Sequence, residues 1–550
     1  MRQPARAESL YRAALRRVEG RVAPEITWRL RAGLALARRA QGFVNDAARE
    51  LRVALGEIEQ PSRSLVLPER RSAFLADKWD VYAQLALTER ARGNAALAFE
   101  ASERLRAREM LELLSRGRVQ APRDTAEELI AREQDLRRRI AELTRDLEAG
   151  SSRNDELRGP DVSNMGGVTR EALLRAQEEY AQLRVELGER APRHAALVSQ
   201  RNVTWREVAQ RLSPREALIE YLVSDSGVVA FVVVRDSVAS IALGTTRREL
   251  VRLVEFARGT IERRGSPRVD SLWRGPLGGL YRTLVAPLEQ TGLLEGTTHL
   301  VIIPHGELHY LPFAALLDGD GRPLVERYEI AFSPSASVWL ALGERLRAPA
   351  TAGILAVAPR PDALPASRRE VGAISRSAGP GVRVMTGSAA TEEAFRREAP
   401  TRRVLHLATY GVLNKHNPLF SFVELAPGGE HDGRLEVHEV FGLRLTADLV
   451  VLSACQTGLG SGALTDVPAG DDWVGLTRAF LHAGAKRVVA TLWPVDDWAT
   501  AALMERFYEE IVAGTNARRA LARAQRALRA ERATAHPFYW AGFVVIGSTE

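Results

Sequence analysis

One cysteine, Cys455, is the residue of this chain best suited to nucleophilic chemistry. It follows a short apolar run, Asp448-Leu-Val-Val-Leu-Ser-Ala, and precedes a loop that carries several glycines up to Gly462. A thiolate attacks carbonyl carbon, and the backbone amides of such a loop can stabilise the oxyanion that develops. A lone cysteine also excludes an internal disulfide and a metal cage of several thiolates. We therefore interpret Cys455 as a working thiol at the end of a strand.

A cysteine nucleophile needs a general base, normally a histidine, which forms the thiolate and later protonates the leaving amine. A second apolar run, Arg403-Val-Leu-His-Leu-Ala-Thr, leads into Tyr410 and Gly411, where no histidine stands. His406 lies within that run, four residues before Tyr410 and so roughly 13 Å away along an extended strand. We interpret His406 as a packed, hydrogen-bonded core residue rather than as the base.

Another histidine, His416, could take the role of base because it lies in the loop after Gly411 and a loop can approach Cys455. The other histidines considered have no sequence reason to meet the thiol: His305, His309 and His438. Three acids after the cysteine could line a pocket for a basic side chain: Asp466, Asp471 and Asp472. The glycines after Cys455 lack the Lys-Ser/Thr of a phosphate-binding loop, and no helical pair of histidines indicates a metal site. We therefore expect no cofactor and no metal.

The elements that position these residues alternate between helices and short, continuous apolar runs. Runs of this kind are typical of strands buried on both faces of a parallel sheet, where ligands bind outside the carboxyl ends of the strands. Before them, three alternating segments joined by Ser, Asp and Gly turns predict a small meander at 217–223, 227–234 and 237–243. The runs themselves predict strands at 299–303, 353–358, 403–409, 448–454 and 486–492. The sequence thus predicts one α/β domain at residues 215–550.

The N-terminal part contains a helical repeat that appears when the chain is shifted by 51 positions. Trp28 then falls on Trp79 and Gly42 on Gly93, with matching Leu-Ala-Leu and Ala positions around them. A bulky residue, a glycine at the turn and small residues at the helix contact are what a helical hairpin needs. We expect repeats over residues 1–120, with Pro61 and Pro68 marking an inserted connection. Local pairing of these helices predicts that residues 1 to about 200 fold without the rest of the chain.

Two heptad seams follow, one from Leu129 to Leu147 and one from Leu173 to Leu187, separated by a Gly, Ser, Asn and Pro-rich stretch. They predict an antiparallel helical hairpin within residues 121–212, rather than an intermolecular coiled coil.

Composition limits the range of functions. The chain has 550 residues, 45% hydrophobic and 26% charged, as in soluble globular proteins of several domains. No apolar run is long enough for a membrane span and the start is charged, so we expect a cytoplasmic protein that contacts no membrane. The net charge of +7 comes from arginines interleaved with acids, which favours solvated helix faces over a nucleic-acid surface.

Five separated motifs resemble the CHAT domain, a relative of caspases and separases that commonly follows tetratricopeptide repeats. They are His406-Leu-Ala-Thr-Tyr-Gly411, Ser453-Ala-Cys-Gln-Thr-Gly458, Trp493-Pro-Val-Asp-Asp497, the run from His536 to Phe543, and Ile303-Pro-His-Gly-Glu-Leu-His-Tyr-Leu-Pro-Phe313. The N-terminal repeat resembles the tetratricopeptide repeat, with a longer period. The resemblance implies a caspase-like α/β sandwich with a mostly parallel central sheet, and a cysteine endopeptidase where family members are active.

Carried over residue by residue, the resemblance makes Cys455 the nucleophile and Gly411 the source of an oxyanion-hole amide. The family histidine that precedes this glycine is replaced by Tyr410. A phenol titrates near 10 in model peptides and is a poor base for a thiol at neutral pH. We therefore expect impaired or absent peptidase activity, with a regulatory or protein-binding role and a protein or peptide partner held by the repeats. The alternatives are an active endopeptidase that uses Cys455 with His416 or another base, and a helical-repeat adaptor with an inert α/β domain.

Overall fold

The computed structural model describes residues 3–18, 24–64, 78–116, 203–262, 271–344, 352–412, 421–429, 431–456, 471–493 and 495–548, with a few positions between 135 and 179. The expected hairpin within 121–212 therefore lies almost entirely outside the described residues. Its last part contains the short helix α10 (Trp205–Arg211), which begins with a capping box between Thr204 and Glu207. No helix in the described part of the chain combines the length and the apolar character that a membrane crossing requires.

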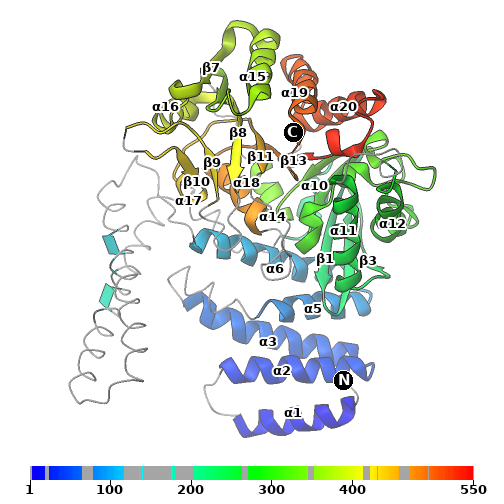
Figure 1. Ribbon diagram of the computed structural model, residues 1–550. Coiled ribbons are helices and arrows are strands. Elements are labelled where there is room, and N and C mark those ends of the chain that lie inside the picture. The colour runs from blue at the N-terminus through cyan, green and yellow to red at the C-terminus, as the bar shows by residue number, and fades with distance from the viewer. Residues whose placement is uncertain are drawn as a thin grey trace.

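In the described residues of the N-terminal part the regular elements are all helices, and they stack in chain order towards the sheet (Figure 1). They are α1 (Pro4–Val18), α2 (Pro24–Ala40), α3 (Val44–Ser64), α5 (Trp79–Ala91) and α6 (Ala95–Arg116). The turns between α2 and α3 and between α5 and α6 contain Gly42 (φ 86°) and Gly93 (φ 77°), in the left-handed region that favours glycine. The repeat with its offset of 51 is thus confirmed as two helical hairpins. The expected position of Pro61 was wrong, because α3 continues through it to Ser64.

A 13-stranded sheet forms the rest of the core. Its strands are β1 (Glu216–Ser224), β2 (Gly227–Val233), β3 (Val238–Leu243), β4 (His299–Ile303), β5 (Glu329–Phe332), β6 (Ala352–Ala358), β7 (Val382–Thr386), β8 (Arg402–Val412), β9 (Phe422–Glu424), β10 (Arg434–Glu436), β11 (Leu449–Gln456), β12 (Arg487–Thr491) and β13 (Phe543–Gly547). The predicted meander and the predicted buried strands are all confirmed. Five strands were not predicted from the sequence: β5, β7, β9, β10 and β13.

Helices cover both faces of this sheet (Figure 1). Besides α6 and α10 they are α11 (Arg247–Glu262), α12 (Arg274–Leu284), α13 (Ala286–Glu289), α14 (Ala336–Glu344), α15 (Pro365–Ala378), α16 (Glu392–Glu398), α17 (Val437–Val440), α18 (Asp471–Ala483), α19 (Asp497–Val512) and α20 (Ala517–Ala530). Covering helices explain why the strand sequences are continuously apolar rather than alternating.

The sheet consists of two parallel halves that run in opposite directions. One half is β7-β6-β8-β11-β12, with β13 added antiparallel to β12. The other half contains β5, β4 and β1 in parallel, and the meander continues it through β2 and β3. Since β13 pairs in parallel with β5, the strands β4 and β5 run opposite to β8 and β11. The carboxyl ends of the two halves therefore lie at opposite edges of the sheet.

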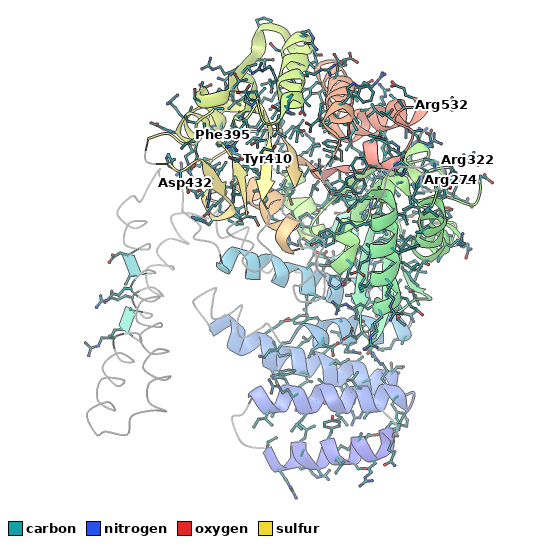
Figure 2. The ribbon with its side chains drawn as sticks, viewed as in Figure 1. Arg274, Arg322, Phe395, Tyr410, Asp432 and Arg532 are labelled. Carbon is teal, nitrogen blue, oxygen red and sulfur yellow. The ribbon has the colours of Figure 1, made fainter. Side chains whose placement is uncertain are left out.

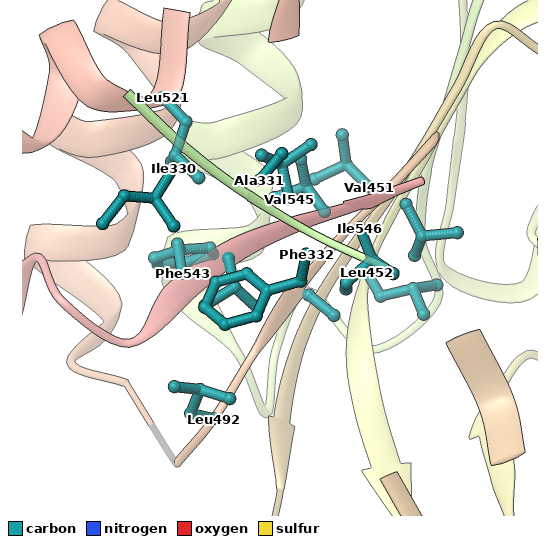
Figure 3. Close-up of a cluster of buried hydrophobic side chains, with 14 of the residues drawn as sticks. Ile330, Ala331, Phe332, Val451, Leu452, Leu492, Leu521, Phe543, Val545 and Ile546 are labelled. Carbon is teal, nitrogen blue, oxygen red and sulfur yellow. The ribbon is translucent and has the colours of Figure 1, made fainter. Parts of the chain in front are cut away.

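The two halves meet at a single residue pair, Ile546 of β13 with Phe332 of β5. Figure 3 shows the buried side chains around this junction, contributed by β5, β11, β13 and the neighbouring α20. Apolar packing rather than a long hydrogen-bond ladder holds the halves together at this point, which is the reverse of the usual arrangement within a sheet.

The repeats share a core with the second half of the sheet. Phe99 of α6 is fully buried, and its ring centroid lies 6.1 Å from that of Phe231 on β2. The guanidinium of Arg106, also buried, donates to the carbonyl oxygen of Pro304 at 2.7 Å and to that of Tyr221. The buried carboxylate of Glu103 accepts from the backbone amide of Ala336 at 2.8 Å, where α14 begins.

Glu220 of β1 completes this contact as a fully buried carboxyl that shares a hydrogen bond with the Ser102 hydroxyl. Burial raises the pKa of Glu220 well above its usual range, and the neighbouring Glu103 raises it further while Arg106 opposes both. The shared core argues against our expectation that the N-terminal part folds alone, because α6 would expose both apolar and charged groups that the sheet now satisfies.

We predict that Phe99→Ala destabilises the repeats and the sheet together. Truncating a buried phenylalanine costs about 3 to 5 kcal/mol, whereas Phe43→Ala, at a side chain that is 54% exposed, should change stability by about 0.5 kcal/mol or less. Hydrogen exchange should report lost protection in α6 and in β1 and β2 of the Phe99→Ala protein. Protection lost from the helices alone would contradict the shared core.

Candidate functional site

The site expected from the sequence forms where β8 and β11 end side by side. These parallel strands pair in a continuous register that sets Ala454 opposite Thr409, Cys455 opposite Tyr410 and Gln456 opposite Gly411. Neighbouring strands lie about 4.8 Å apart, so positions 455 and 410 are adjacent in space. Both strands reach the same edge of the first half of the sheet, where an α/β fold of this kind binds its ligands.

Tyr410 is half-buried at this edge, and Figure 2 shows it at the end of β8. Its hydroxyl donates to the carbonyl oxygen of Ala363 at 3.4 Å, a long and partly solvated hydrogen bond. Ala363 lies in the connection between β6 and α15, on the face of the sheet that α15 covers. The phenol is therefore oriented by a weak contact, and the strand position next to Cys455 is occupied by a group without a basic nitrogen.

The backbone around this position is held more firmly than the phenol. The buried Thr409 hydroxyl donates to the carbonyl oxygen of Glu424 on β9 at 2.6 Å. Gly411 has strand neighbours on both sides, Gln456 of β11 and Val423 of β9. The end of β8 is thus fixed by two strands, and a residue placed at position 410 inherits that geometry.

His406 lies deeper along β8, on the same side of the strand as Tyr410, and is fully buried. Its Nδ1 lies 3.0 Å from the hydroxyl of Tyr508 on α19, and its Nε2 lies 3.1 Å from a carboxylate oxygen of Glu370 on α15. Both ring nitrogens thus have a neighbour in the core, and the interpretation of His406 as a packed core residue is confirmed. Burial raises the pKa of Tyr508 well above its usual value, and the Glu370 carboxyl adds to the effect.

The other residues considered for the site from the sequence lie in several different parts of the chain. His416 and Asp466 lie outside the described residues, while Asp471 and Asp472 begin α18. The loop after β4 holds His305, whose Nδ1 accepts from the backbone amide of Val223 at 2.8 Å, and the buried His309.

These β4 histidines do not belong to the Cys455 site. Their strand runs opposite to β11 and lies four strand spacings from it, roughly 19 Å. His438 lies on α17, with its Nδ1 3.0 Å from a carboxylate oxygen of Glu436. Within the described chain, the only histidine position placed in β8 or β11 is therefore His406.

The partners that fix these residues could not be predicted from the sequence: Ala363, Glu370 and Tyr508. No local pattern marks them, because they come from helices and connections that are far from β8 in the chain. The same holds for a cluster of Glu392, His431 and Glu439 near β9 and β10. The guanidinium of Arg396 lies 2.7 Å from Glu392 and 2.6 Å from Glu439, so both carboxylates already pair with the same internal cation.

The CHAT domain profile matches residues 274–548, half of the chain. The chain belongs to the CHAT domain family. Tetratricopeptide repeat protein 28 of Mus musculus is 27% identical over 343 residues, which cover 51% of this chain and 14% of that protein. The Homo sapiens protein of the same name is 27% identical over 338 residues, covering 51% of this chain and 13% of that protein. The chain thus spans about a seventh of the length of the curated relatives it matches.

Among solved structures, the separase–securin complex of Saccharomyces cerevisiae is similar with a TM-score of 0.42 at 11% identity, covering 99% of this chain and 48% of that one. The Arg-specific cysteine proteinase gingipain R has a TM-score of 0.29 at 9% identity over 55% of this chain and 75% of that one. The expected order of N-terminal helical repeats followed by an α/β sandwich with a mostly parallel central sheet is confirmed.

We predict that the phenol of Tyr410 on β8 and that of Tyr508, which contacts His406 of β8, differ in their contribution to stability. Tyr508→Phe removes the hydroxyl next to His406 in the core and should cost about 1 to 3 kcal/mol, because a buried ring nitrogen loses its partner. Tyr410→Phe removes only a long, partly solvated hydrogen bond and should change the free energy of unfolding by less than about 0.5 kcal/mol. Urea denaturation measures both, and equal losses would contradict this description of the site.

Proposed function

We propose that this CHAT domain is a regulatory or protein-binding module on a cysteine endopeptidase scaffold, and that Tyr410 impairs or abolishes its peptidase activity. The register that sets Tyr410 opposite Cys455 carries the proposal, because the family histidine at that position would stand beside the nucleophile. A phenol there cannot generate a thiolate at neutral pH, nor can it protonate a leaving amine as an imidazolium does. In this proposal Cys455 is the nucleophile position and the Gly411 amide the oxyanion donor.

We propose three functional segments: helical repeats at 1–120, a helical hairpin at 121–212 and the CHAT domain at 215–550. The repeats would hold a protein or peptide partner, since stacked helical hairpins present an extended surface for such ligands. Large apolar side chains lie exposed on α1 and α2 and in the turn before α3, with Leu10 64%, Ile26 51% and Phe43 54% accessible. We place the protein in the cytoplasm, with a polypeptide rather than a nucleic acid or a membrane as its ligand.

An active endopeptidase is the second candidate, because the strand positions of the nucleophile and the oxyanion glycine are retained at one sheet edge. In that case His416, which follows β8 in the chain, would supply the base. Asp466, Asp471 and Asp472 would then be the acids that receive a basic substrate side chain. An adaptor with an inert α/β domain is the third candidate. The core shared by α6 and the sheet gives that domain at least a structural role.

We predict that Tyr410→His restores or strongly raises peptide cleavage. Base and acid catalysis by a positioned histidine contributes about 10² to 10⁴ in rate, and the fixed end of β8 gives the new imidazole the position next to Cys455. Cleavage is measured on a peptide library by mass spectrometry. Tyr410→Phe is the matched control, since it changes the same ring without adding a base, and Tyr410→His with Cys455→Ala should remain inactive.

The parent protein and its His416→Ala variant decide between the first two candidates. A parent that cleaves peptides and loses this activity on His416→Ala is an active enzyme with His416 as its base, and the proposal is then wrong. Absence of cleavage in both the parent and the Tyr410→His variant, in the presence of an intact fold, would show that more than the base is missing.

A further inference from the structure

A large cavity lies away from the Cys455 edge, on the side of the molecule where Figure 2 labels Arg274 and Arg532. Its volume is about 1050 Å³, at the upper end of the range for small-molecule sites. The start of α12, the loop around Gly321 and the segment that follows α20 form its walls. Figure 2 shows Tyr410 well separated from these arginines, so the cavity is distinct from the site at β8 and β11.

The cavity carries an excess of positive charge. Three arginines and one carboxylate line it: Arg274, Arg529, Arg532 and Glu262. Arg529 pairs with Glu326 at 2.6 Å, and Glu262 lies 3.4 Å from the guanidinium of Arg258. Among the described residues, Arg274 and Arg532 have no carboxylate within ion-pair distance. Both side chains are exposed, so within the described part of the chain two solvated guanidinium groups at the cavity are open to an anion.

Aromatic rings form the wall beside these charges. The Trp273 ring centroid lies 5.8 Å from that of His536, and the His536 centroid lies 6.4 Å from that of Tyr539, each pair edge-to-face. The guanidinium of Arg274 lies 4.9 Å from the Trp273 ring, which keeps this charge next to the aromatic wall. His536 and Tyr539 are only half-buried, so parts of their rings are available to a ligand.

We propose that this cavity binds a phosphorylated small molecule that carries a planar ring, of which a nucleoside monophosphate is the simplest. A phosphate monoester carries a charge of about −1.5 to −2 at neutral pH, which matches these two guanidinium groups. The planar fork of guanidinium donors fits phosphate oxygens in bidentate geometry. A planar ring stacks on aromatic side chains and on arginine. The aromatic wall and the guanidinium beside it offer both kinds of surface.

Isothermal titration calorimetry of the full chain tests the proposal with four ligands: AMP, adenosine, inorganic phosphate and succinate. AMP should bind with saturable heat, and adenosine and phosphate should each bind at least about tenfold more weakly, because each lacks one half of the recognised group. Arg274→Gln and Arg532→Gln should each weaken AMP binding about tenfold or more through loss of a charge-assisted hydrogen bond. Arg322→Gln is the matched control, since Arg322 already pairs with Asp318 and Asp320 and does not line the cavity.

Three results would overturn the proposal. The first is that AMP gives no heat at millimolar concentration, and the second is that it binds the Arg274→Gln, Arg532→Gln double variant as tightly as the parent. The third is that succinate binds more tightly than AMP, which would make the site one for carboxylates or acidic peptides instead. A thermal melt of each variant establishes that the fold is retained, and because the ligands act away from Cys455, the outcome is independent of peptidase activity.

Discussion

The parallel ladder between β8 and β11 pairs residues in one continuous register, from Leu449 with Val404 to Gln456 with Gly411. A slip by one residue would turn every side chain of one strand to the other face, so apolar burial on both faces fixes the register strongly. His406 adds a polar constraint, since it lies in the ladder with a neighbour from α15 and another from α19. The pairing of positions 410 and 455 is therefore a consequence of the core, and the chemistry at that edge depends on which side chain occupies position 410.

The same dependence on packing joins the repeats to the sheet. Arg106 of α6 binds the carbonyl oxygens of Tyr221 and Pro304, on or directly after β1 and β4, and Glu103 binds the start of α14. Buried charges of this kind are costly unless each hydrogen bond is made, and removal of one partner leaves the other uncompensated. A ligand on the outer helices would therefore bind to helices that share a core with the β1–β4–β5 half of the sheet. The single residue pair between β13 and β5 joins that half to the half that carries the Cys455 edge.

Much of this architecture could be predicted from the sequence because its signals are local. Continuous apolar runs indicated β4, β6, β8, β11 and β12, and the glycines 51 residues apart indicated the two helical hairpins. Strands such as β5 and β9 were missed because they are short and interrupted, and their pairing depends on distant segments. The opposed directions of the sheet halves could not be predicted either, since only pairing with β13 reveals them. Glu370 and Tyr508 could not be predicted for the same reason, because their role follows from their packing against His406. The arginine-lined cavity could not be predicted because its walls come from separate parts of the chain.

We propose that Tyr410 leaves Cys455 without a cationic base, and the pH dependence of Cys455 alkylation tests this proposal most directly. Cys455 is the single cysteine of the chain, so incorporation of iodoacetamide measured by mass spectrometry reports this thiol alone. A thiol without a cationic partner titrates near about 8.5, whereas a paired imidazolium lowers that value by several units. The account predicts an alkylation rate that still rises between about pH 7 and pH 9, as for a free thiol. A rate that has already levelled off below about pH 6 would show a thiolate stabilised by a base, and would contradict it.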